Sequence, residues 1–437
     1  MNFRLRQLMI TQLTIDNRPT LPEVLHWLPA LEVLYVRSKP CEKNAAVALY
    51  LDADRLPRLK TVATIGLYLC STSTALTGLR EITMKATPYG ILNVPKLETL
   101  LRSCTSLESL SLGEISTQPS FEGGPRIVIP TLSSVKLQGH WSFIQSMISV
   151  LHIPAHVNLE AHHIVHSPVV PARVPWGAQG LALLLPAPAD GRHLQTLPLL
   201  GQANIAQVRF GSPIFSTHFV ITVTHRQPDA PSALLGHGAR RMGRSATFEV
   251  APAVWCDQTR RSFARDLSIT YETGLFLRYA PLEELVVVVD VDEDLLRVDW
   301  IMLLGAIGVR LRKLTIHIVN NAWNTGHADP PQNGVSCSSV WAVVGALSPS
   351  HAGATLCPHL QALWVTGFKE FPGYRVLREI DACITSRLAA EGLEQKLDDV
   401  LLRGVWKGAQ GAGHDAETVY EGVLGPKLKV FSYELAL

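Results

Sequence analysis

Three histidines in the middle of the chain have a spacing that can bind a metal ion. His162 and His166 are four residues apart, with His163 beside the first. This spacing puts two imidazoles on one face of a helix, as in many zinc sites. A structural zinc site needs a third and a fourth ligand, and no neighbouring cysteine or carboxylate pair supplies them. Because Pro168 and Pro171 also disfavour a helix, we interpret the three as polar loop residues and predict no metal ligand here.

Acidic residues gather after an apolar run and have the composition of a cation site. They are Asp290, Asp292, Glu293 and Asp294. Carboxylates at alternate positions can hold calcium, but the glycine and the terminal glutamate of an EF-hand loop are missing. We interpret them as a solvated turn that caps the next helix, close to a surface that a partner can touch.

The main concentration of positive charge lies further along the middle of the chain. It consists of Arg240, Arg241, Arg244, Arg260, Arg261 and Arg265. Phosphate or nucleic-acid contact is one interpretation, but aromatic residues are not interleaved with these arginines. The net charge of the chain is only +2, which gives no strong attraction to nucleic acid or to an anionic membrane. We therefore predict a solvated loop and neither a nucleic-acid nor a membrane partner.

Nothing in the sequence nominates a catalytic group or a cofactor. There is no Gly-x-Ser-x-Gly, no phosphate loop ending in Gly-Lys-Ser/Thr, and no Gly-x-Gly-x-x-Gly. The seven cysteines have no paired two-residue spacing, and their odd number does not indicate a disulfide framework. We expect a protein that is not an enzyme and needs no cofactor.

Composition favours a large apolar core in a reducing compartment. Hydrophobic residues make up 47% of the 437 residues and charged residues 17%, which excludes a disordered tail. The opening Met1-Asn2-Phe3-Arg4-Leu5-Arg6 lacks the apolar run of a secretory signal. No stretch approaches the ~20 uninterrupted apolar residues that span a bilayer. We expect a cytoplasmic or nuclear protein.

A six-residue pattern, Leu-x-x-Leu-x-apolar, recurs along the chain and must organise these residues. Its copies begin at residues 5, 31, 59, 79, 107, 132, 282, 311, 360 and, weakly, 397. In the first half the copies lie 20 to 28 residues apart, the period of a leucine-rich repeat built from a short strand and a returning helix. The last two apolar positions are two residues apart and face one side of a strand, which only a stack of strands can bury.

The intervals between copies predict helices. Leu97, Leu100, Leu101 and Cys104 form a helical stripe, and so does a longer set between Val376 and Leu388. Phe143, Met147 and Leu151 form another, with Ser142 as its N-cap. Pro29, Pro57 and Pro358 precede strands, where proline ends a helix.

The sequence predicts an α/β leucine-rich-repeat-like solenoid, with parallel strands on the concave face, helices outside and an irregular middle. Regular repeats occupy residues 1–160 and 263–437. Residues 161–262 contain irregular repeats with long proline- and glycine-rich loops, including weak strands at 205–210 and 219–224 and a loop at 232–245.

Several phrases resemble the repeat region of fungal, basidiomycete F-box proteins. The phrase that runs from Leu100 to Leu112 is similar to one that recurs in that family, and those that begin at Cys357 and Cys383 look like its late repeats. His152-Ile153-Pro154-Ala155-His156-Val157 resembles a turn that those proteins carry mid-chain. The resemblance implies a substrate-recognition part of an SCF-type ubiquitin ligase adaptor.

The F-box itself is not recognisable. Leu21-Pro22-Glu23-Val24-Leu25 is similar to the opening of an F-box, but a repeat strand follows at once at Leu31, so we interpret it as a repeat helix. We expect a Skp1-type adaptor as partner only if an F-box is missing from this sequence.

The concave face is the expected binding surface. Positions between the buried residues of each strand point to it, and exposed aromatic side chains there have the character of binding anchors. We predict a non-enzymatic scaffold that holds a protein partner; the alternative is a metal-binding protein or an enzyme with its site in the irregular middle. The expected partner contacts are Tyr35, Ser111, Lys136, Val286, Thr315 and Trp364.

Overall fold

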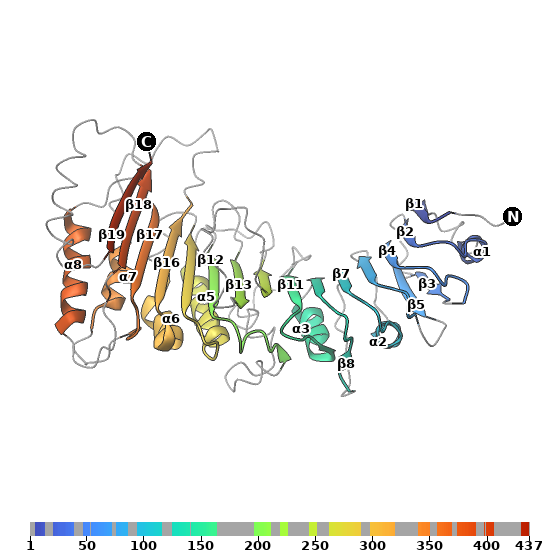
Figure 1. The fold of residues 1–437 in the computed structure, drawn as a ribbon, viewed down its shortest axis with the longest axis horizontal. Helices are drawn as coiled ribbons and strands as arrows, with labels where there is room; N and C mark the ends of the chain where they lie inside the picture. Colours follow the sequence, from blue (N-terminus) through green and yellow to red (C-terminus); the bar gives the residue numbers. More distant parts are fainter. Residues whose placement is uncertain are drawn as a thin grey trace. The chain divides into compact units, whose positions relative to one another are not determined.

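The computed structural model (Figure 1) consists of two compact units. Unit 1 comprises Met1–Val174, Ala182–Leu199 and Arg244–Cys256, and unit 2 comprises Pro175–Leu181, Leu200–Gly243 and Asp257–Leu437. The structure describes residues 5–13, 21–38, 47–52, 54–71, 76–85, 94–115, 125–139, 141–163, 196–210, 219–225, 244–250, 262–289, 298–319, 340–349, 356–368, 374–389, 397, 399–405 and 430–436.

Unit 1 contains a long parallel sheet whose strands lie side by side, mostly in chain order. Every neighbouring pair in it is parallel. From one edge, the order is β1 (Gln7–Leu13), β2 (Val33–Ser38), β4 (Thr61–Ile65), β6 (Glu81–Lys85), β7 (Ser109–Ile115), β9 (Ser134–Gly139), β11 (Asn158–His163) and β14 (Arg244–Val250).

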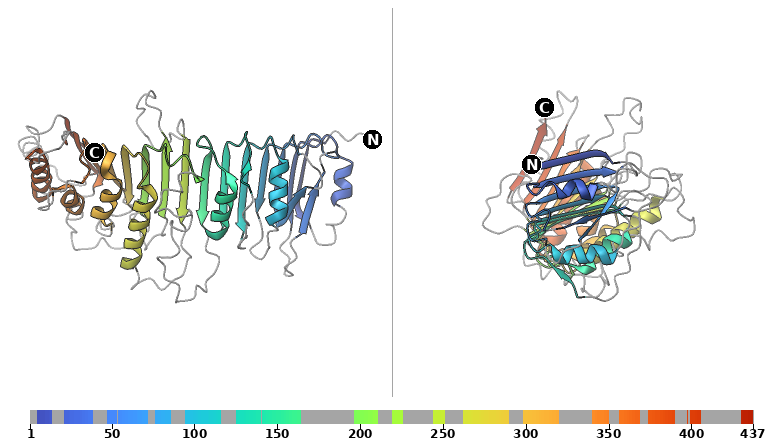
Figure 2. Two further views of the ribbon diagram at one scale, coloured as in Figure 1. Left: turned by 90° about the horizontal axis from the view of Figure 1, so that it is seen from below. Right: turned by 90° about the vertical axis from the view of Figure 1, so that its right-hand side faces the viewer.

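The connections between these strands contain helices and small strands. The helices are α1 (Leu21–His26), α2 (Val94–Ser103) and α3 (Trp141–Val150). Figure 2 (left) shows α2 and α3 on one side of the unit 1 strands. The small strands form two parallel pairs, β3 (Val47–Leu51) with β5 (Leu67–Ser71), and β8 (Ile127–Val128) with β10 (Leu151–His152).

The expectation of a helix in every interval is wrong for two of them. Between β2 and β4, and again between β4 and β6, the described part of the chain forms β3 and β5. Each is a run of five residues that includes tyrosine and branched or apolar side chains, which suit a pleated, half-buried ribbon. Ser142 is also not an N-cap, because α3 already begins at Trp141.

Unit 2 is built on the same plan, with one antiparallel pair. Its strands, in sheet order, are β13 (Phe219–His225), β12 (Ile205–Phe210), β15 (Glu284–Val289), β16 (Lys313–Ile318), β17 (Ala362–Phe368), β18 (Asp399–Val405) and β19 (Val430–Ala436). From β12 onward each pair is parallel, whereas β13 is antiparallel to β12. The helices are α5 (Ser262–Leu277), α6 (Trp300–Ile307), α7 (Val340–Leu347) and α8 (Tyr374–Ala389), with the short helix η5 (Gly308–Arg310), and consecutive α-helices contact one another.

The repeated hexapeptide determines both the strand and the turn before it. In the copy that begins at Leu31, Leu34 and Val36 face the core with no exposed surface. The amide of Leu31 donates to the carbonyl of Leu28 at 3.0 Å, which closes a turn with Pro29 at its second position, where proline is favoured. Leu59 and Leu360 close equivalent turns. The expected α/β class and parallel strands are therefore confirmed: the protein has long, mostly parallel sheets with interspersed helices.

Candidate partner-binding site

One face of each sheet carries the alternate residues that are not buried, and we call it the open face. In unit 1 the paired register aligns one residue from each successive strand in a row across it: Met9, Tyr35, Ala63, Thr83, Ser111, Lys136, Glu160 and Thr247. Tyr35, Ser111 and Lys136 are each half-buried. The three unit 1 residues expected to contact a partner thus share one row.

The Lys136 side chain is held by a carboxylate on the next strand. Its Nζ lies 2.8 Å from Oε2 of Glu160, and His162 Nε2 lies 3.4 Å from the same oxygen. The hydrogen bond from Lys136 is the main reason that the pKa of Glu160 lies below its ordinary value. A partner that approaches this point meets a neutralised pair rather than a free cation.

The three expected contacts in unit 2 also lie in one row, on adjacent strands. Val286, Thr315 and Trp364 are consecutive register partners on β15, β16 and β17. Val286 and Trp364 are half-buried, but Thr315 is only 4% exposed. Its Oγ1 has no hydrogen-bond partner in the described part of the chain. The expectation that Thr315 is an exposed contact is therefore wrong, because its neighbourhood already excludes solvent.

Trp364 is fixed by charged groups from two neighbouring strands. Lys313 Nζ lies 3.4 Å from the centroid of its ring, and its Nε1 donates to Oδ2 of Asp399 at 3.2 Å. Lys313 in turn forms an ion pair with Glu284 at 3.1 Å, in which the Glu284 side chain is 13% exposed. A cation over an indole contributes roughly 0.5–1 kcal/mol at partly exposed sites. The indole is therefore positioned before any partner arrives.

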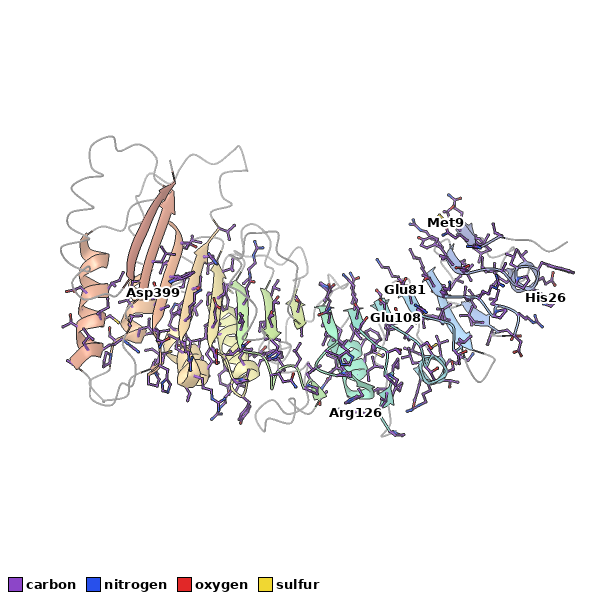
Figure 3. The ribbon with its side chains drawn as sticks, in the orientation of Figure 1. Met9, His26, Glu81, Glu108, Arg126 and Asp399 are labelled. Carbon is purple, nitrogen blue, oxygen red and sulfur yellow. The ribbon has the colours of Figure 1, made fainter. Side chains whose placement is uncertain are left out.

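A second line of charges follows the first variable position of the hexapeptide in unit 1. Glu32 lies 3.7 Å from Arg6 and 2.9 Å from Lys60, and Arg80 lies 3.3 Å from Glu108. Figure 3 labels Glu81 and Glu108, which lie at the starts of the neighbouring strands β6 and β7. The hydrogen bond and charge of Lys60 lower the pKa of Glu32. These pairs neutralise the edge of the sheet where the strands begin.

Sequence reasoning missed the charges around Trp364, although a signal was present. Glu284, Lys313 and Asp399 occupy the same position, the second variable residue, in the copies that begin at 282, 311 and 397. Register pairing brings that position into one row across β15 to β18. Opposite charges at one motif position in successive copies therefore predict contact across the sheet.

The other candidate residues do not form a site in the described part of the chain. His162 and His163 lie on strand β11, so the interpretation of these two as loop residues is wrong, and a strand cannot give the helical spacing of a zinc site. His166 lies outside the described residues, as do Asp290, Asp292, Glu293 and Asp294.

The arginine cluster is not the single loop that we expected. Arg244 begins strand β14 in unit 1, whereas Arg265 lies in helix α5 in unit 2. Arg240, Arg241, Arg260 and Arg261 lie outside the described residues.

The cysteines that the structure describes are buried thiols. Burial raises the pKa of Cys104 to about 11 and that of Cys357 to about 12, and it also raises the pKa of Cys70 and of Cys383. A thiol with so high a pKa is protonated at neutral pH and is a poor nucleophile. These four side chains serve as small apolar groups.

Within the described residues, no group of three or more histidine, cysteine, aspartate or glutamate side chains is placed to hold a metal ion. No helix in the same part of the chain is long and apolar enough to cross a membrane. No protein-family model matches the chain, and no curated protein matches its sequence.

Proposed function

We propose that the protein is a leucine-rich-repeat-like solenoid that binds a protein partner through the open face of its sheets. Two features support the solenoid. Successive copies of one hexapeptide form adjacent parallel strands, and the same short turn precedes them. Such stacks offer extended surfaces that suit large partners rather than small substrates.

The observation that carries the proposal is the arrangement around Trp364. Binding hot spots are enriched in tryptophan, and binding is tighter when the contact residue is already immobilised. Lys313 covers one region of the indole ring and Asp399 accepts its N–H. Trp364 is only half-buried, so part of its surface is left to solvent or to a partner, and Val286, two strands away in the same row, adds apolar surface.

Quantitative affinity capture tests the proposal. The full chain and its Trp364→Ala variant are used as baits in extract from the cells that produce the protein, and the retained proteins are compared by mass spectrometry. We expect the affinity for at least one retained protein to be about thirtyfold or more lower in the variant, because losing a hot-spot side chain costs about 2 kcal/mol or more.

Ile301→Ala is the matched control. Ile301 is a large apolar residue on helix α6 and is 67% exposed, so its loss removes apolar surface away from the open face. A partner that is lost with Ile301→Ala and kept with Trp364→Ala would refute binding through the open face.

The resemblance to fungal F-box proteins makes a ubiquitination substrate the partner class that we propose. That role needs recruitment of a Skp1-type adaptor. Purified Skp1 mixed with the purified chain gives a direct test by size-exclusion chromatography. Co-elution would support a ligase role, whereas separate elution would leave a binding scaffold that recruits no ligase through these residues.

A further inference from the structure

Two cations on the open face of unit 1 differ from the other charges there. The side chains of Arg37 and Lys85 have no hydrogen bond, ion pair or ring contact in the part of the chain that the structure describes. By contrast, Lys60, Arg80 and Lys136 each face a carboxylate within 3.3 Å. Among the described residues, most of the positive charge on this face is therefore compensated, and that of Arg37 and Lys85 is not.

The register puts these two cations in one row at the carboxyl ends of their strands. Arg37 on β2 is the partner of Ile65 on β4, and Ile65 is the partner of Lys85 on β6. Two strand spacings separate the cations, which is about 9.5 Å. Ile65 is half-buried and provides an apolar surface between Arg37 and Lys85.

Lys85 is held in place by the residue that follows it in the row. Gly113 is its register partner on β7. A Cβ at Gly113 would lie 3.3 Å from Lys85 Cγ and 3.4 Å from Gln138 Oε1, so these side chains already pack over the glycine. The stem of Lys85 therefore loses less conformational entropy when its ammonium binds an anion.

We propose that this row, Arg37, Ile65 and Lys85, binds an acidic segment of a partner protein that lies across the strands. A polyproline II segment has three residues per turn and a rise of about 3.1 Å per residue. Its positions i and i+3 therefore face the same side about 9.3 Å apart, close to the separation of the two cations. The segment that fits carries Asp or Glu at every third residue.

Peptide is favoured over nucleic acid on this face. Nucleic-acid binding depends on neutralising several phosphates, about six to ten in strong complexes, and among the described residues of this face only Arg37 and Lys85 are uncompensated. The inference rests on the proposed function, since it names the partner chemistry of the same open face.

Fluorescence anisotropy with a labelled (Glu-Pro-Pro)4 peptide and the full chain tests whether this row binds an acidic segment. We expect this peptide to bind more tightly than the matched (Gln-Pro-Pro)4 peptide, and its binding to weaken as salt is raised. The double variant Arg37→Gln/Lys85→Gln should weaken binding about five- to tenfold, since each exposed ion pair is worth up to about 1 kcal/mol.

The double variant Lys60→Gln/Arg80→Gln is the control, because it removes the same charge from the compensated edge of the sheet. It should change binding less than twofold. The inference is overturned if both double variants weaken binding equally, if the two peptides bind alike, or if a single-stranded oligonucleotide binds more tightly than the acidic peptide. A negative peptide result together with a partner lost by Trp364→Ala removes this inference and keeps the proposed function.

Discussion

At the residue scale, unit 2 depends on a buried arginine. Arg387 on α8 is 2% exposed. Its guanidinium donates to the carbonyls of Leu347 at 3.1 Å, Leu356 at 3.0 Å and Cys357 at 2.7 Å. Desolvation lowers the pKa of this guanidinium, although arginine stays charged. One side chain thus joins α8 to the end of α7 and to the turn before β17.

Replacing Arg387 with methionine keeps an apolar stem and leaves these carbonyls without their donors. We expect the free energy of unfolding to fall by about 3 kcal/mol, because unpaired buried acceptors cost about 1–3 kcal/mol and bonds to charged donors are the stronger ones. Urea unfolding measures the change. The exposed Arg310→Met is the control and should lie within about 0.5 kcal/mol of wild type; equal effects of the two would contradict the role of Arg387.

Gly308 packs closely against Cys357, in the turn that Arg387 also contacts. A Cβ there would lie 2.6 Å from Cys357 Sγ and 3.2 Å from the Cys357 amide nitrogen, and Cys357 itself has a positive φ of 53°. Gly308→Ala should destabilise the protein by about 1–3 kcal/mol through overpacking. Gly305→Ala on α6 meets nothing closer than 3.8 Å and should stabilise by roughly 0.5–1 kcal/mol. Thermal unfolding of both variants checks this, and a neutral Gly308→Ala would show that the turn can move.

At the element scale, hydrophobic spacing predicted the strands well. The hexapeptides that begin at 31, 107 and 311 form β2, β7 and β16. The predicted helical stripes appear in α2, α3 and α8, except that Cys104 follows α2 and Leu151 lies on strand β10. Burial decides these elements locally, since a strand must turn its leucines inward. The spacing failed for β3 and β5, because short apolar runs fit either a helix or a strand until a neighbour pairs with them.

Adjacent residues of one strand should differ sharply in their tolerance of substitution. Leu110 has no exposed surface and lies between Ile82 and Val135 in the register, whereas Ser111 is half-buried on the open face. Leu110→Ala should cost about 2–5 kcal/mol. Ser111→Ala should change stability by less than about 0.5 kcal/mol. Chemical unfolding of the two variants measures the contrast, and similar costs would contradict the assignment of the two faces.

The stability that the Lys136–Glu160 ion pair adds between β9 and β11 should depend on pH in the acid range. Because the folded-state pKa of Glu160 is below its ordinary value of 4.5, its stabilising effect is present above that value and is lost as the pH falls through the folded pKa. The effect is below about 1 kcal/mol, since both side chains are partly exposed and screened. Titration by NMR should show the pKa of Glu160 rising in Lys136→Met; an unchanged pKa would mean that the ion pair is absent in solution.

At the scale of the whole molecule, sequence periodicity could not predict how the middle of the chain is divided between unit 1 and unit 2. Residues 200–243 belong to unit 2, whereas β14 returns to unit 1 and pairs with β11. Such a pairing joins segments far apart in the sequence, and no local pattern encodes it. The two rows of candidate contacts followed from strand alternation alone. The charges that fix Trp364 required knowledge of the register, because Lys313 and Asp399 reach it from other strands.

Site-specific photo-crosslinking tests the central claim, that the open face binds a protein. A photoreactive phenylalanine analogue replaces Val286 on the open face and, in a second protein, Ile301 on helix α6. Irradiation in cell extract should give a discrete crosslinked partner from position 286 that disappears when Trp364→Ala is added, and no such partner from position 301. A partner crosslinked from position 301 alone, or one from position 286 that persists without the tryptophan, would contradict the account.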